Sequence, residues 1–177
     1  LVEAHARIAT LLQSSGSRDR TVRRAWQDVS TVYEQVAGTV SASGRHYGAQ
    51  AAFYGLEESL ESFLAIEYSS NDRRNAELLI ITKPEELAEL ERQGMSMISV
   101  YQDFEYSSAA LYAIGAAYLA YSDMLYDAPP PSGLDDEELV LYQEAIDEQR
   151  IPIEDKGRAR LEANLEKAST EGGWSEW

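Results

Sequence analysis

Cysteine is absent from the chain. Disulfide bonds, thiol nucleophiles and thiolate metal sites are therefore excluded. Histidine occurs only as His5 and His46, and neither lies in an H-E-x-x-H or E-x-x-H motif. A zinc protease site or a di-iron helical bundle would lack its ligands in this sequence.

Catalytic and membrane signatures are also missing. The sequence contains no G-x-S-x-G motif, no Walker loop and no dinucleotide fingerprint. No apolar run approaches the roughly 20 residues of a membrane helix, and no segment has the form of a signal peptide. Several carboxylates fall at predicted helix starts and on polar faces, where they are usually solvated: Glu57, Glu58, Glu85, Glu86 and Glu91. The sequence thus predicts no enzyme, no cofactor and no metal site.

Positive charge is scarce. The chain has 15 Lys and Arg against 31 Asp and Glu, which gives a net charge of −16. Phosphate backbones and anionic lipid surfaces should repel such a chain. The predicted partners are therefore other proteins with basic surfaces, without nucleic acid and without direct membrane insertion. The one basic cluster is expected to pair with acids elsewhere in the chain: Arg18, Arg20, Arg23 and Arg24.

Apolar residues recur at helical spacing in almost every segment, which predicts an all-α fold of about seven helices. Gly16 is a usual position for a left-handed helix end, Ser41–Gly44 is expected to end the second helix, and Pro152 to separate the last two. The predicted helices span residues 1–15, 20–40, 45–67, a segment from about 82, 107–126, 135–150 and 153–168.

The segment 68–83 is the least regular part of the sequence. Its LLII run is compatible with a strand, a buried connector or a helix start, and these alternatives stay open. Thr82 and Glu85 have the spacing of a capping box, and Pro84 suits a first helical turn. The fourth helix is therefore expected to begin near Thr82.

The first four predicted helices each have an apolar face. In the first helix it consists of Ile8, Leu11 and Leu12. In the second the spacing alternates between four and three residues: Val22, Trp26, Val29, Tyr33, Val36 and Val40. The third has Ala49, Phe53, Leu56, Leu60, Phe63 and Leu64, and the fourth has Leu87, Leu90, Gly94, Met97, Tyr101 and Phe104. These faces are the predicted core.

The helix over 107–126 is rich in tyrosine and has two apolar stripes. One stripe consists of Leu111, Ile114, Tyr118, Tyr121 and Leu125, and the other of Tyr112, Leu119 and Tyr126. A helix that is apolar on two sides is expected to be buried on two sides. Packing between helices is the favoured interpretation. The alternative is a compact helical bundle that binds a small apolar ligand among its tyrosines.

Three consecutive prolines, Pro129–Pro131, stop this helix, and Gly133 allows a turn. The acids Asp135–Glu138 then favour a helix start, because negative charge is stabilised at a helix N-terminus. The carboxylate spacing and the glycine of a calcium-binding loop are missing here. The stretch is interpreted as a connection between two helices.

Two segments resemble the first-helix pattern W-x-x-L-G-x-x-Y of tetratricopeptide repeats. One consists of Trp26, Val29, Ser30 and Tyr33, and the other of Leu111, Ile114, Gly115 and Tyr118. The last predicted helix resembles the second-helix pattern A-x-x-x-F-x-x-A at Gly157, Leu161 and Asn164. In such repeats a small residue lets the paired helices approach, and the large residues fill the gap.

From about Met95 to Trp177 the sequence resembles the C-terminal helical region of tetratricopeptide-repeat proteins of the myxobacterial envelope and gliding-motility type. The resemblance implies antiparallel helical hairpins stacked as an α-solenoid, in one domain over residues 1–177. It also implies a non-catalytic scaffold for protein–protein interaction in the periplasm or cell envelope. Leu1 begins within a helical pattern, so further repeats are expected upstream of this fragment.

Aromatic residues off the predicted core faces are the candidate contacts for a protein partner, because exposed aromatic side chains are frequent binding anchors. Tyr47 and Tyr54 lie on the third predicted helix, and Trp174 and Trp177 lie near the end of the chain. The two tryptophans are also compatible with packing on a following helix.

Overall fold

The structure, a computed structural model, describes residues 1–65, 77–171 and 173. These residues form six α-helices and no β-strand, which confirms the all-α prediction with one helix fewer than expected. A 3₁₀ turn, Ala37–Thr39, follows α2, and a π-helical turn, Leu78–Thr82, leads into α5. The helices are α1 (Val2–Ser14), α2 (Asp19–Val36), α3 (Ala42–Leu64), α5 (Lys83–Tyr101), α6 (Phe104–Asp127) and α7 (Asp136–Glu171).

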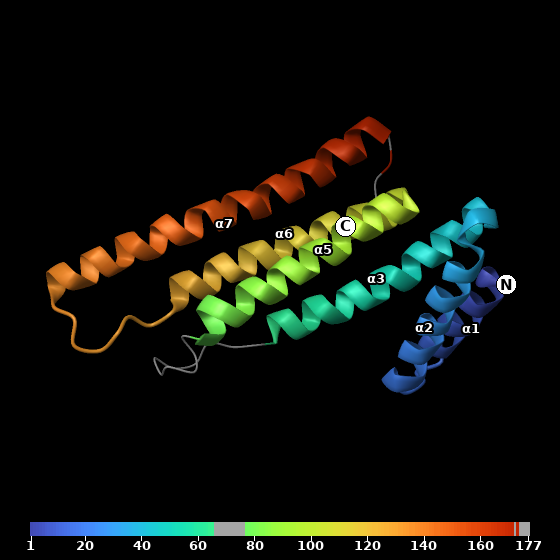
Figure 1. The fold of residues 1–177 in the computed structure, drawn as a ribbon, viewed down its shortest axis with the longest axis horizontal. Helices are drawn as coiled ribbons and strands as arrows, with labels where there is room; N and C mark the ends of the chain where they lie inside the picture. Colours follow the sequence, from blue (N-terminus) through green and yellow to red (C-terminus); the bar gives the residue numbers. More distant parts are fainter. Residues whose placement is uncertain (66–76, 172, 174–177) are drawn as a thin grey trace.

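The long helices α3, α5, α6 and α7 run roughly along one axis, and the α1–α2 hairpin lies across one end of them (Figure 1). The molecule is therefore elongated. Helix α3 belongs to two cores. Its first half packs with α1 and α2 around Trp26, Val29 and Tyr33, while Phe53, Leu56 and Phe63 join the larger core built with α5 and α6.

The predicted sixth and seventh helices are one helix in the structure, since α7 continues through Pro152. The separation at Pro152 was the wrong prediction. A proline inside a helix removes one backbone hydrogen bond and costs about 3 kcal/mol. A ladder of ion pairs spans the position: Arg150 Nε donates to Asp147 Oδ1 at 2.6 Å, and Arg150 Nη1 to Glu154 Oε2 at 3.1 Å. Packing along α6 adds to this support.

Two predicted helix boundaries also differ from the structure. Ser41–Gly44 does not merely end the second helix, because Ser41 caps α3 and accepts a hydrogen bond from the Gly44 amide at 2.9 Å. Thr82 is not a helix cap, since its backbone is already helical and its side chain makes no capping bond. The π-helical turn explains this, because the Lys83 amide donates to the Leu78 carbonyl. The LLII run is therefore the start of a helix, one of the alternatives left open.

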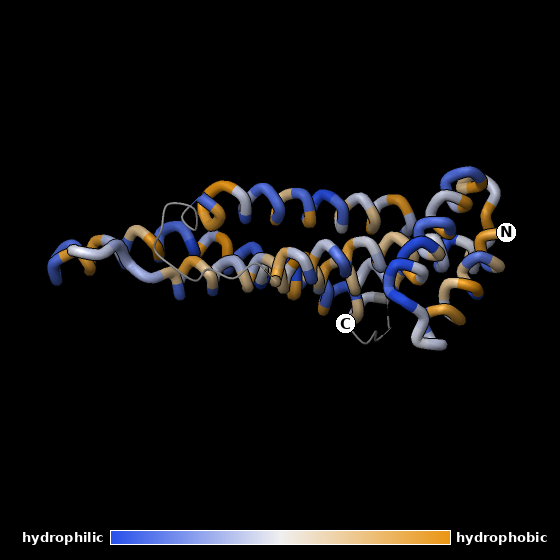
Figure 2. Tube along the Cα trace, turned by 90° about the horizontal axis from the view of Figure 1, so that it is seen from below, coloured by the Kyte–Doolittle hydropathy of each residue, from blue (hydrophilic) through white to orange (hydrophobic). Residues whose placement is uncertain are grey.

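The predicted inner face of α1 is correct at Leu12, which is partly buried against the α1–α2–α3 core, and wrong at Ile8 and Leu11. Val2, Ala6 and Ala9 are buried, whereas Ile8 and Leu11 are exposed. This helix has two apolar faces, and the smaller residues lie against α2 and α3 because they allow a closer approach. Figure 2 shows apolar residues recurring along the helices, this one included.

The predicted stripe of α2 is confirmed at four buried residues, Val22, Trp26, Val29 and Tyr33. In α6 the first stripe is buried throughout: Leu111, Ile114, Tyr118, Tyr121 and Leu125. The second stripe is wrong at Tyr112 and Tyr126, which are exposed, whereas Leu119 is partly buried and lies against Gly157 of α7. The other sides of α6 are buried through small residues instead, among them Ala109, Ala113 and Ala117.

Glycine sets the closest approach of α6 and α7. A Cβ atom on Gly115 would lie 2.8 Å from the Leu161 side chain and 3.1 Å from the Gly157 carbonyl oxygen. A Cβ atom on Gly157 would lie 3.0 Å from the Tyr118 Cβ atom. In the α2–α3 pair, a Cβ atom on Gly48 would overlap the Tyr33 ring. Small residues therefore permit the close approach of α6 to α7 and of α2 to α3. The sequence pattern predicts this for α6 and α7.

Candidate functional site

Helices α6 and α7 are antiparallel in a register that contacts at both ends of α6 define. At the start of α6, the Lys167 Nζ atom lies 5.6 Å from the centre of the Phe104 ring, and Gly173 lies against the same ring. At the other end, the Arg150 guanidinium carbon lies 4.9 Å from the centre of the Tyr126 ring. The C-terminal part of α7 is thus aligned with α6.

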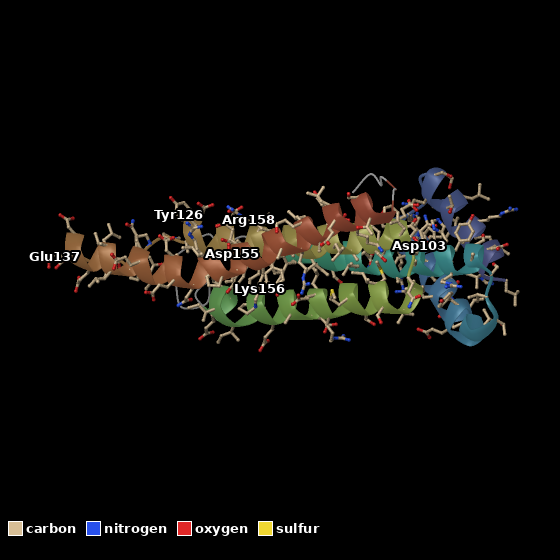
Figure 3. All side chains as sticks on the ribbon, turned by 90° about the horizontal axis from the view of Figure 1, so that it is seen from above. Asp103, Tyr126, Glu137, Asp155, Lys156 and Arg158 are labelled. Carbon is tan, nitrogen blue, oxygen red and sulfur yellow. The ribbon has the colours of Figure 1, made fainter. Side chains whose placement is uncertain are left out.

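The first turns of α7 extend past the end of α6 because α7 is much longer. The two helices have 36 and 24 residues, which correspond to about 54 Å and about 36 Å at about 1.5 Å per residue. Since Arg150 is level with Tyr126, nearly all of the difference falls on residues 136–149, called here the α7 overhang. Figure 3 shows Glu137 on α7 well beyond Tyr126.

The α7 overhang has apolar side chains on more than one side. Leu139, Tyr142 and Ile146 face a groove of about 500 Å³ that is completed by the end of α6 and the proline connector. Val140 and Leu141 do not line this groove and are 53% and 65% exposed. A helical segment with an uncovered apolar side is typical of a protein-binding surface.

Acidic residues surround these apolar side chains. Residues 123–149, called here the acidic end, contain nine Asp and Glu and no Lys or Arg. Two of the acids start α7: Asp135 accepts hydrogen bonds from the amides of Glu137 and Glu138, and the Glu138 carboxylate accepts one from the Asp135 amide. Six others make no ion pair with any described residue: Asp123, Asp127, Asp136, Glu137, Glu144 and Glu148.

The opposite end of the molecule is formed by residues 1–27, called here the arginine end. It contains five Arg and two acids. Only Arg23 behaves as predicted for the basic cluster, through an ion pair with Glu58 of α3. Arg7, Arg18, Arg20 and Arg24 make no ion pair with an acid in the part of the chain that the structure describes. The outer apolar stripe of α1 lies at this end, and its Leu11 is 66% exposed.

The predicted partner-binding aromatics lie in two different situations. Tyr47 and Tyr54 are half-buried and pack on the α1–α2–α3 core. The Tyr54 ring stacks on Trp26 with 6.1 Å between ring centres. Part of each tyrosine remains accessible, so both stay candidate contacts. Trp174 and Trp177 lie outside the described residues.

The buried tyrosines of α6, Tyr106, Tyr118 and Tyr121, fill space between helices. The Tyr121 hydroxyl donates to the Leu79 carbonyl oxygen at 2.9 Å, and the Tyr118 hydroxyl donates to Glu91 Oε2 at 2.7 Å. Burial, this hydrogen bond and the charge of Glu91 raise the pKa of Tyr118 to about 12. These contacts correspond to the packing interpretation. For the apolar-ligand alternative, tyrosines line two surface grooves, one of about 500 Å³ at Tyr126 and Tyr142 and one of about 720 Å³ at Tyr33 and Tyr101.

Glu91 corrects another expectation, because it is not merely a solvated residue on a polar face. Its carboxylate accepts hydrogen bonds from Tyr118 of α6 and, at 2.6 Å, from Arg160 Nη2 of α7. Burial raises the pKa of the Glu91 carboxyl, but the hydrogen bonds from Tyr118 and Arg160 outweigh it and hold the pKa below its usual value. Glu91 therefore joins three helices.

No group of three or more His, Asp or Glu residues within the described ranges is placed to hold a metal ion. Nor is any described helix both long and apolar enough to cross a membrane. No family model, curated protein or solved structure matches the chain. The features that bear on function are therefore the α7 overhang at one end of the molecule and the arginine end at the other.

The sequence reasoning missed both ends. The overhang exists because α7 is one continuous helix that is longer than α6. A break predicted at Pro152 gave two short helices, so this difference in length between α6 and α7 was not predicted. Ile8 and Leu11 of the outer stripe of α1 were visible in the sequence, but they were interpreted as core. Nine acids without a base over residues 123–149 were the available signal.

Proposed function

We propose that this chain is a non-catalytic scaffold for protein–protein interaction, built from tetratricopeptide-like helical hairpins. The observation that carries the proposal is the α7 overhang, where Val140 and Leu141 lie exposed on a helix that extends past its neighbour. A projecting helix with apolar anchors and a charged rim has the composition of a protein interface.

The stacked-hairpin arrangement is supported by the order of contacts. Helices α1 and α2, α2 and α3, α5 and α6, and α6 and α7 pack on one another in chain order. In two pairs, the tyrosine of the tetratricopeptide-like pattern lies against a glycine of the next helix: Tyr33 against Gly48 and Tyr118 against Gly157. A role in the cell envelope rests on the sequence resemblance alone, and fractionation of the source cells tests it.

Quantitative co-purification tests the interaction role. The tagged chain is recovered from its source cells as wild type and as Val140→Ser/Leu141→Ser, and the co-purifying proteins are measured. We expect the double variant to lose its partners at unchanged helicity. Ala159→Ser is the control on an exposed position of α7 within the bundle and should keep them. Equal recovery with all three forms would reject the overhang as the binding surface.

A further inference from the structure

The start of α7 and the α1–α2 hairpin lie at opposite ends of the elongated molecule (Figure 1). Each of these ends has exposed apolar side chains, Val140 and Leu141 at one and Ile8 and Leu11 at the other. The charges of the two ends have opposite sign. The arginine end has five Arg against two acids, a net charge of +3, although the whole chain carries −16. The acidic end has nine acids and no Lys or Arg, a net charge of −9. Each end therefore has the charge that would attract the other end of a second molecule.

We propose that copies of this chain associate head to tail, with the acidic end of one copy on the arginine end of the next. The inference rests on the proposed interaction role and names a second copy as the partner. Apolar contact between the α7 overhang and the outer stripe of α1 forms the centre of the interface. The surrounding charges select the partner and its orientation.

Four arginines of the arginine end, Arg7, Arg18, Arg20 and Arg24, make no ion pair with any described acid of their own molecule. Arg18 and Arg20 lie at the N-terminus of α2, where the helix dipole disfavours positive charge. Arg24 follows Arg20 by one helical turn and is also exposed. Acids from another molecule would reduce this repulsion. Glu144 and Glu148 of the α7 overhang, which make no ion pair with a described residue, have the same spacing of four residues, so the two rows can pair.

The apolar side chains match in kind. Ile8 and Leu11 are exposed on α1 at helical spacing, with Leu1 exposed just before the helix, and Val140 and Leu141 are exposed on the α7 overhang. Apolar residues ringed by charges are the usual composition of a specific interface. A contact of one helix segment with a helical hairpin is small, so the association should be weak and dependent on concentration.

The symmetry of the contact decides what assembles. The two surfaces are different and lie at opposite ends, so each bound copy leaves one surface of each kind free. Such a heterologous contact adds further copies instead of stopping at a dimer. The scaffold would thus form linear arrays.

Sedimentation of the purified chain tests the inference. We expect the weight-average mass to rise with concentration above the monomer mass of 19.7 kDa at low salt. It should fall again near 1 M salt, where the Debye length shortens to about 3 Å. A wild-type chain that stays monomeric at every concentration at low salt would overturn the inference.

Charge-reversed variants separate a specific contact from general charge effects. Arg20→Glu/Arg24→Glu and Glu144→Lys/Glu148→Lys should each stay monomeric alone, whereas an equimolar mixture of the two should regain association. Glu162→Lys/Glu166→Lys, with the same charge change and spacing within the bundle part of α7, should associate like wild type. A monomeric mixture, or loss of association in this control, would contradict head-to-tail contact.

The inference and the proposed function fail in different experiments. A monomeric chain whose overhang still recovers another protein from cells would overturn self-association and leave the scaffold role in place. Equal recovery by wild type and Val140→Ser/Leu141→Ser would instead reject the overhang as the surface that binds other proteins, whatever the sedimentation shows.

Discussion

Replacing Glu91 by alanine should lower the free energy of unfolding by about 2 kcal/mol. The substitution removes the acceptor of the Tyr118 hydroxyl at 2.7 Å and of Arg160 Nη2 at 2.6 Å. A hydrogen bond to a charged group contributes about 1.5–3 kcal/mol. The Arg160 and Glu91 side chains are 35% and 26% exposed, so water screens their pairing and reduces its share. Most of the loss should come from Tyr118, whose hydroxyl would be left without this acceptor.

Urea unfolding measures this effect. For a denaturant slope of about 2 kcal/mol per molar, the midpoint should fall by about 1 M. Glu89→Ala is the control, because Glu89 lies two residues away on the same helix. Among the described residues its side chain bonds with Arg92 and Gln93, which lie one turn along that helix. This control should change the midpoint little. Equal midpoints for the two variants would refute the argument that Glu91 joins α5, α6 and α7.

The difference in stability between wild type and Glu91→Ala should also depend on pH. Because folding holds the pKa of Glu91 below its usual value, its ionised form adds stability above the unfolded-state pKa. That stability is lost as the pH falls through the lower folded-state pKa. The difference between wild type and Glu91→Ala should therefore narrow in acid. A difference that stays constant down to the folded-state pKa would contradict the assignment of a charged Glu91.

Three further predictions concern glycine, tyrosine and a helix end. Gly115→Ala should destabilise the chain by about 1–3 kcal/mol, because the added methyl group overpacks against α7. Gly55→Ala should stabilise the chain by roughly 0.5–1 kcal/mol, because the space around the Cβ position is open. Thermal melting of both variants measures these changes. Burial is the main cause that raises the pKa of Tyr101 and Tyr118 to about 12. The free energy of unfolding should therefore fall as the pH rises from the unfolded-state pKa toward the folded-state pKa, and it should fall less steeply in Tyr118→Phe. Denaturant titrations at alkaline pH would contradict this if the free energy of unfolding fell equally steeply with pH in both proteins. Gln102 has a left-handed backbone with φ of 50°, so Gln102→Gly should not destabilise the chain, and a lowered melting temperature would show that its side chain matters.

The sequence predicts the fold best where large side chains mark a single face. In α2, Trp26 and Tyr33 lie on the predicted stripe and are buried, because no second apolar face competes with it. In α1, the two faces are both apolar, and hydrophobicity does not tell which one has a partner. The closer packing of Ala6 and Ala9 decides it, and this depends on tertiary contacts.

The candidate site is harder to predict because it depends on lengths and register. Local sequence rules predict that a helix ends at a proline. In the structure α7 continues past Pro152, because ion pairs of Arg150 and packing on α6 stabilise it. Only the continuous helix extends past α6. The acids around Leu141 were evident in the sequence, but the exposure of Leu141 between them follows from three-dimensional packing.

Site-specific photo-cross-linking tests whether the α7 overhang contacts another protein. A photoreactive residue replaces Leu141 on the α7 overhang or, as the control, Glu162 on the part of α7 that lies along α6. After irradiation of the source cells, the account predicts covalent protein adducts at position 141 and few at position 162. If position 141 gives no protein adduct, or if both positions give the same adducts, the α7 overhang is not an interaction surface.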